Sequence, residues 1–173
     1  PVGRQPEQLL LANGKVYVAN SDENTISVFV ILGSTYTGHY EPVEEIHQIL
    51  DEYEKKAGID IPVHVDAASG GFIARFTHAR AGGPKWNFEL PRVKPISASG
   101  NQLGLVYAGL GWAIWRDESY LSKDMIFELH YLGGTEESYT LNFSRPGAQG
   151  IAQYFNRIHL GFTGYRTIME TAP

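Results

Sequence analysis

The sequence contains no cysteine among its 173 residues. A disulfide framework and a thiolate metal site are therefore both excluded, and we expect a reducing, cytoplasmic compartment. The chain also lacks any uninterrupted apolar run of about 18 residues, the length that a membrane span requires. Residues 1–8 lack the basic-then-apolar order of a secretion signal. We therefore expect neither a membrane-spanning segment nor a leader peptide.

Basic residues are scarce as well. The chain has 14 Lys and Arg against 19 Asp and Glu, which gives a formal net charge of -5. Binding to nucleic acid needs a concentrated basic surface, so we do not expect a nucleic acid partner. The six histidines show no His-x-x-x-His pair, so we expect no metal site. A hydrophobic content of 43% is enough to build the core of one ordinary domain.

Several short runs of apolar and β-branched residues predict strands. They are Val16–Ala19, Thr25–Ile31, Ile61–Val65, Arg92–Ser97 and Gly111–Trp115. The third run is wholly apolar apart from one histidine, as expected for a buried parallel strand, and it presents Asp66 at its carboxyl end. Pro95 conflicts with the fourth run, because proline cannot donate to a strand ladder and normally lies at edges or bulges.

Apolar residues at helical spacing predict two helices. The first begins near Glu41 and ends at Gly58, with an acidic face, Glu44–Glu54, that we expect to be solvated. The second covers residues 148–169, where Gly161 should weaken it by up to about 1 kcal/mol relative to alanine. The order strand, helix, strand predicts an α/β fold with a mainly parallel sheet flanked by helices.

Three small, hydroxyl-bearing and glycine-rich clusters directly follow predicted strands. They cover residues 33–38, 66–71 and 97–100. Ligands of open α/β sheets bind beyond the carboxyl ends of the strands. Such clusters let backbone amides approach a phosphate or carboxylate closely, although each alone could be only a tight turn. The occurrence of all three together favours a binding site.

Four ordered segments resemble their counterparts in bacterial and plant glutamate decarboxylases. They are Asp22–Ile26, Ile31–Glu41, His64–Phe72 and Asn142–Gly147. The resemblance runs from about Asp22 to Arg166. It implies the central part of the large domain of a fold-type-I pyridoxal-phosphate enzyme, incomplete here, in a family that forms homo-oligomers. The implied reaction removes the α-carboxylate of L-glutamate to give 4-aminobutyrate and carbon dioxide.

The resemblance also implies roles for individual residues. Asp66 would pair with the protonated pyridine nitrogen of pyridoxal phosphate, and Ala68 would pack against one face of the ring. Ser99 would donate to the phosphate, and Thr35 would lie near the cofactor and substrate carboxylates. No metal enters this set of site residues.

The chain departs from the family at its most important position. The family places His-Lys after Ser-Ala-Ser-Gly, and that lysine forms the Schiff base with the cofactor, whereas this chain has Asn101 and Gln102 there. A glutamine amide is neutral and non-nucleophilic, so it cannot form an imine. We therefore predict that the chain alone is inactive, also because the family's flanking segments are absent. The alternative is a non-catalytic interaction or regulatory fragment that packs on an intact homologue.

The N-terminal part suggests a separate unit. The segment Gly14–Val28 resembles one repeat of a β-propeller, although a single repeat cannot close a propeller. We therefore divide the chain into a strand-rich N-terminal segment whose origin the sequence leaves open, residues 1–21, and a fragment of the decarboxylase large domain, residues 22–173.

Overall fold

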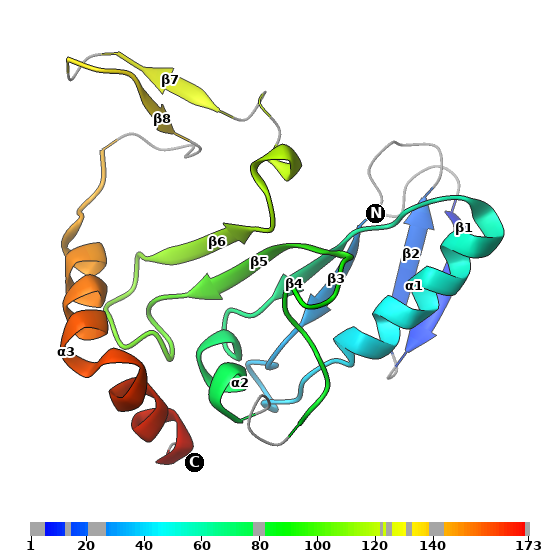
Figure 1. The fold of residues 1–173 in the computed structure, drawn as a ribbon, viewed down its shortest axis with the longest axis horizontal. Coiled ribbons are helices and arrows are strands. Elements are labelled where there is room, and N and C mark those ends of the chain that lie inside the picture. The colour runs from blue at the N-terminus through cyan, green and yellow to red at the C-terminus, as the bar shows by residue number, and fades with distance from the viewer. Residues whose placement is uncertain are drawn as a thin grey trace.

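The computed structural model describes most of the chain. The described residues are 6–12, 15–20, 27–77, 82–121, 123, 126–130, 133–138 and 144–171. Within them the strands form three separate sheets, of which the central one has four strands (Figure 1). Of the segments that resemble the decarboxylases, Asp22–Ile26 and the first two residues of Asn142–Gly147 lie outside the described residues.

The central sheet has the strand order β3-β4-β5-β6. Its strands are β3 (Val28–Ile31), β4 (Val63–Asp66), β5 (Val93–Ser99) and β6 (Gly111–Trp115). The first three run parallel, and β6 pairs antiparallel with β5. The expected mainly parallel α/β sheet is thereby confirmed, with β5 extending two residues further than its sequence pattern predicted.

Pro95 lies in a β-bulge of β5. Val63 pairs with Val93, and Val65 pairs with Ile96, so β5 has one more residue than β4 between the two pairs. The ladder between β4 and β5 is already interrupted there, so the missing N–H of proline costs no regular ladder bond. The conflict between this proline and a central strand is thus resolved by local geometry.

Helix α1 (Val43–Ala57) covers one face of the central sheet. Val43, Ile46 and Leu50 are buried and join the apolar side chains of β3, β4 and β5 in one core. The helix ends at Gly58, which adopts the left-handed conformation (φ 72°) and donates its N–H to the carbonyl of Glu54. Both the predicted helix and its glycine stop are confirmed.

The acidic face of α1 is exposed or half-exposed, as expected, but it also forms ion pairs with the sheet. Arg92, only 4% exposed, extends from the start of β5 to three carboxylates. Its Nε donates to Asp51 (2.6 Å), one terminal nitrogen donates to Asp60 (2.5 Å) and the other donates to Glu54. Burial opposes the charge of the guanidinium, but these carboxylates outweigh it and raise the pKa of Arg92 above its ordinary value. Two members of the acidic face therefore anchor the helix to the sheet.

The first two strands form a hairpin of their own. Strand β1 (Pro6–Ala12) pairs antiparallel with β2 (Lys15–Asn20). The strand expected at 16–19 is present, but its partner is β1 and not the next apolar run. That run enters the central sheet as β3, beginning at Val28, because β4 offers it a parallel partner. The proposed boundary between residues 21 and 22 stays a prediction.

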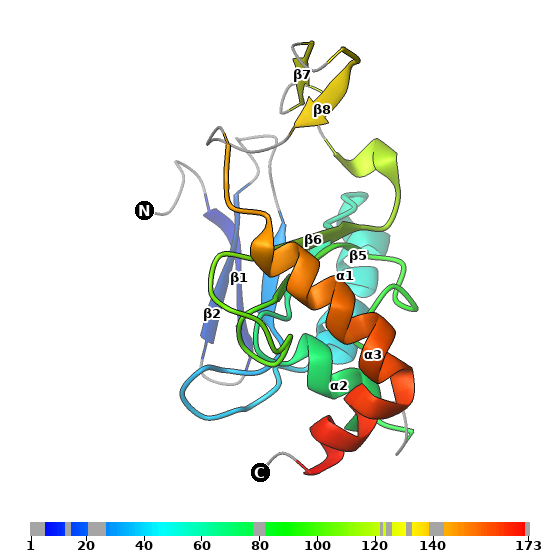
Figure 2. The same ribbon diagram turned by 90° about the vertical axis from the view of Figure 1, so that its left-hand side faces the viewer.

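Helices α2 (Gly71–Thr77) and α3 (Ala148–Thr171) pack against each other beside β5 and β6 (Figure 2). The ring centroids of Phe72 and Tyr165 lie 5.9 Å apart. Gly161, with φ 57° and ψ -167°, divides α3 into two helical segments, so this glycine interrupts the predicted helix and does more than weaken it.

A third sheet stands apart from the central one in Figure 1. It consists of β7 (Phe127–Leu129) and β8 (Glu136–Ser138), which pair antiparallel and follow the short 3-10 helix η2 (Glu118–Tyr120). In the part of the chain that the structure describes, no helix is both long and apolar enough to cross a bilayer.

Candidate functional site

The carboxyl ends of the three parallel strands are joined by backbone hydrogen bonds. The N–H of Leu32, after β3, donates to the carbonyl of Asp66 (2.8 Å), and the N–H of Gly70 donates back to Leu32 (2.9 Å). The N–H of Ser99 donates to the carbonyl of Ala68 (3.3 Å). The three glycine-rich clusters therefore meet at one edge of the sheet, as expected for parallel strands.

Two glycines make this close approach possible. A Cβ on Gly70 would lie 2.3 Å from the carbonyl oxygen of Leu32, and a Cβ on Gly33 would lie 2.8 Å from the nitrogen of Gly70. Gly33 also has a positive φ of 94°. Any side chain at these positions would push the first two clusters apart, so the site depends on glycine here.

Asp66 lies at the centre of this edge, on the sheet face opposite α1. Its Oδ1 accepts hydrogen bonds from the N–H of Ala68 (3.1 Å) and the hydroxyl of Ser97 (3.4 Å). No described residue donates to its other carboxylate oxygen, Oδ2, at hydrogen-bond distance. These hydrogen bonds hold Oδ1 of Asp66 in place and leave Oδ2 available to a ligand that donates an N–H.

His64 extends the same group of side chains. Its Nε2 lies 3.2 Å from the Ser97 hydroxyl, and its ring lies 4.0 Å from the ring of Phe29, centroid to centroid. Burial lowers the pKa of His64 below its ordinary value, although the charge of Asp66 acts in the opposite direction. The lowered pKa favours the neutral form of the ring.

The turn after β5 carries the residues at the family's His-Lys position. The Ser99 hydroxyl donates to Asn101 Oδ1 (2.5 Å), and the N–H of Asn101 donates back to the hydroxyl oxygen (3.3 Å). Gln102 is exposed in this turn, and Thr35 is exposed in the turn after β3. The structure thus joins Asp66 and Ser99 to one edge by hydrogen bonds, while it leaves the side chains of Thr35 and Gln102 in solvent.

Polar side chains of α3 hold the loop that follows Gln102. Gln153 is fully buried, donates to the carbonyl of Gly104 (2.9 Å) and accepts from the indole N–H of Trp112. The hydroxyl of Tyr165 donates to the same carbonyl (3.2 Å). Two further amides make similar bonds, Gln149 to the carbonyl of Ala108 (3.0 Å) and Asn156 to that of Leu105 (2.9 Å).

These bonds from α3 to the loop were not predicted from the sequence. The signal was nevertheless present, because Gln149, Gln153 and Asn156 are spaced by four and then three residues, which places three amides on one side of a helix whose other positions are largely apolar. The bonding partners could not have been named, since they lie 41 to 51 residues away in the chain.

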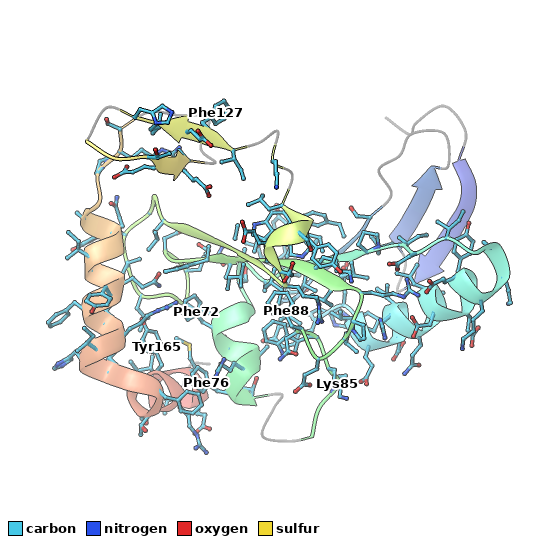
Figure 3. All side chains as sticks on the ribbon, turned by 45° about the horizontal axis from the view of Figure 1, so that its top comes forward. Phe72, Phe76, Lys85, Phe88, Phe127 and Tyr165 are labelled. Atoms are coloured by element: carbon cyan, nitrogen blue, oxygen red, sulfur yellow. The ribbon has the colours of Figure 1, made fainter. Side chains whose placement is uncertain are left out.

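A cleft of about 790 Å³ lies between α2, α3 and the β5–β6 pair. Figure 3 shows Phe72, Phe76 and Tyr165, which pack between the two helices. Two arginines stack on aromatic rings of its lining, Arg157 on Trp112 at 4.5 Å and Arg75 on Phe162 at 5.5 Å. None of the six residues predicted for the site lines the cleft. The candidate site at the hydrogen-bonded strand ends is therefore distinct from this cleft.

A metal site would need several ligand side chains close together among the described residues. Among those residues no three His, Asp or Glu side chains gather closely enough to hold a metal ion. The polar groups of the strand ends, a carboxylate with one available oxygen and nearby hydroxyls, suit an organic ligand with an N–H and an anionic group.

Comparison with known proteins identifies the family of this chain. The family model described as "Pyridoxal-dependent decarboxylase conserved domain" matches residues 4–172. Glutamate decarboxylase of Aliivibrio fischeri is 50% identical over 161 residues, which are 93% of this chain and 34% of that protein. Glutamate decarboxylase 3 of Arabidopsis thaliana is 52% identical over 149 residues, 86% of this chain and 29% of that protein.

Solved structures show the same likeness in three dimensions. The glutamate decarboxylase of Lactobacillus brevis CGMCC 1306 superimposes with a TM-score of 0.76 at 43% identity, over 83% of this chain and 32% of that one. A sphingosine-1-phosphate lyase of Burkholderia pseudomallei K96243 reaches 0.68 at 27% identity, over 86% and 33%. The chain spans about a third of the length of the curated relatives it matches. The resemblance and fold class inferred from the sequence are confirmed, and the chain belongs to the family of pyridoxal-dependent decarboxylases.

Proposed function

We propose that this chain is the cofactor-binding part of a glutamate decarboxylase-like protein, whose reaction converts L-glutamate to 4-aminobutyrate and carbon dioxide. The position of the Asp66 carboxylate is the main observation that supports the proposal. Its carboxylate lies at the carboxyl edge of a parallel sheet, with one oxygen held and the other available. The identity of about 50% to glutamate decarboxylases over most of the chain supports the choice of substrate.

The residues at this edge fit pyridoxal phosphate. In the proposal Asp66 accepts the ring N–H, the small side chain of Ala68 lies against the ring, and Ser99 donates to the phosphate. Thr35 faces the carboxylates of the substrate. When bound, pyridoxal phosphate supplies the electron sink for the carbanion that decarboxylation produces. Asp66 serves this chemistry by keeping the ring nitrogen protonated.

Gln102 excludes covalent attachment of the cofactor at position 102. Its amide cannot link covalently to the cofactor aldehyde, so at this site the cofactor is held by non-covalent contacts alone. In this structure Asn101, at the family's histidine position, accepts the Ser99 hydroxyl proton (2.5 Å). In the proposal this bond breaks when the cofactor binds, because the single hydroxyl proton then goes to the phosphate. The chain by itself therefore binds pyridoxal phosphate without decarboxylating glutamate.

An absorbance spectrum tests the proposal directly. The purified chain is incubated with pyridoxal phosphate, passed through gel filtration and compared with Asp66→Asn treated in the same way. We expect a retained cofactor band that this variant loses, and no adduct by mass analysis after borohydride reduction. Failure of the wild-type chain to retain cofactor, or equal retention by both proteins, would contradict the proposal.

Exposed apolar residues on α3 support a second candidate function, that of a non-catalytic fragment that packs on an intact homologue. Ile151, Tyr154, Phe155 and Ile158 are between 61% and 72% exposed. Their helical spacing forms one apolar face, of the kind that marks a protein interface. In this proposal the chain occurs in the cytoplasm as part of an oligomer with its homologues. Co-purification with a full-length decarboxylase would support it, and a stable monomer in the presence of that protein would contradict it.

A further inference from the structure

Three side chains on the sheet face opposite α1 form one hydrogen-bonded line. His64 Nε2 lies 3.2 Å from the Ser97 hydroxyl oxygen, which in turn lies 3.4 Å from Asp66 Oδ1. The sheet itself sets this line, because His64 and Asp66 are two residues apart on β4 and Ser97 is the register neighbour of Asp66 on β5. Strand pairing, and not a flexible loop, brings the three groups together.

The direction of the hydrogen bonds follows from the chemistry of the groups. The structure gives the single hydroxyl proton of Ser97 to Asp66 Oδ1 (3.4 Å), in keeping with a carboxylate that only accepts when ionised. The hydroxyl oxygen then accepts a hydrogen bond, and the His64 ring supplies it from Nε2. A neutral imidazole carries one proton, so Nδ1 of His64 carries none. The line therefore specifies one tautomer of the histidine.

We propose that Ser97, itself oriented by His64, is a positioning residue that fixes which oxygen of Asp66 is available to the cofactor. With the N–H of Ala68 (3.1 Å) and the Ser97 hydroxyl both on Oδ1, rotation of the carboxylate would break two hydrogen bonds. Oδ2 is thereby kept for the ring N–H of pyridoxal phosphate. This inference rests on the proposed cofactor function and adds the residues that prepare Asp66 for it.

The first test needs no cofactor. Nitrogen-15 NMR of the full chain at pH 8 reports the tautomer of His64 in the wild type, in Ser97→Ala and in Ser97→Thr. We expect the Nε2–H form in the wild type and in Ser97→Thr, which keeps a hydroxyl. In Ser97→Ala the ratio of the two tautomers should change about two- to tenfold, as expected for the loss of one hydrogen bond. A wild-type ring protonated on Nδ1, or an unchanged ratio in Ser97→Ala, would overturn the inference.

The second test uses pyridoxal phosphate labelled with nitrogen-15 in the ring. Ser97→Ala should bind it about two- to tenfold more weakly than wild type, with a smaller protonated fraction of the ring nitrogen. Ser97→Thr should keep both the affinity and the protonated fraction at the wild-type level. A purely structural role of the serine would not predict any change in the protonated fraction of the ring nitrogen. Circular dichroism melting curves check that all variants are folded.

The outcomes separate the two proposals. Equal binding by the wild type and Asp66→Asn, or no binding by either, would overturn the cofactor function and the positioning role with it. If Asp66→Asn weakens binding while Ser97→Ala matches the wild type in affinity and ring protonation, the cofactor function stands and the positioning role is wrong.

Discussion

Replacement of Gln153 by leucine should loosen the loop that follows position 102. This side chain is fully buried and joins α3 to the loop through Gly104 and to β6 through Trp112. Leucine has a similar size but neither donates nor accepts. Two hydrogen bonds are then lost, each with a net value of about 1 kcal/mol, and the partly buried indole N–H keeps no amide partner. We expect a loss of about 2 to 3 kcal/mol in the free energy of unfolding.

Urea unfolding, followed by tryptophan fluorescence and by circular dichroism, measures this loss from the transition midpoint and its slope. The same change corresponds to about 4 to 12 °C in Tm for a domain of this size. Asn156→Leu is the matched control, because Asn156 makes the same kind of bond from the same helix to the same loop, but the side chain is only partly buried and the bond is exposed. The control should lose less than about 1 kcal/mol. Equal losses in the two variants would refute the idea that the buried amide holds the loop.

Four further changes test other features. Arg92→Met should cost about 2 to 3 kcal/mol in urea unfolding, less than a fully buried ion pair would, because its carboxylate partners are half-exposed and become hydrated. Gly70→Ala should destabilise the chain and abolish cofactor retention, since its Cβ would lie 2.3 Å from a carbonyl oxygen, whereas Gly147→Ala, in open space, should change neither. Because the pKa of His64 is lowered on folding, the unfolded chain takes up the proton first. The contribution of neutral His64 to the free energy of unfolding is therefore complete above pH 6.5, and it falls as the pH drops from there through the lower folded pKa. Thermal melts of wild type and His64→Gln over this pH range would show the loss in the wild type only. Gln102→Lys should permit a borohydride-trapped cofactor adduct, which peptide mapping would locate at residue 102 and at no other lysine.

The local pattern of the sequence was sufficient to predict the main elements. Apolar spacing predicted α1 and its end at Gly58, and short β-branched runs predicted the strands of the central sheet. The position of Asp66 at a strand end, together with the three glycine-rich clusters, predicted where a ligand would bind. These features follow from residues close together in the chain, because helical and strand periods and turn preferences are local properties.

Other features were decided only by the tertiary structure. The apolar run before position 31 could pair with β2 or with β4, and the choice of β4 depends on a strand more than thirty residues away. The burial of Arg92 among three carboxylates and the bonds of Gln153 likewise join residues that are 32 to 49 positions apart. Periodicity specifies which face of an element is apolar, but the partner of a buried polar group depends on how the elements are packed. For this chain the sequence by itself therefore determined the family and predicted the strand ends as the location of a site. The packing of distant elements decided which groups hold Asp66 and the loop after Gln102 in place.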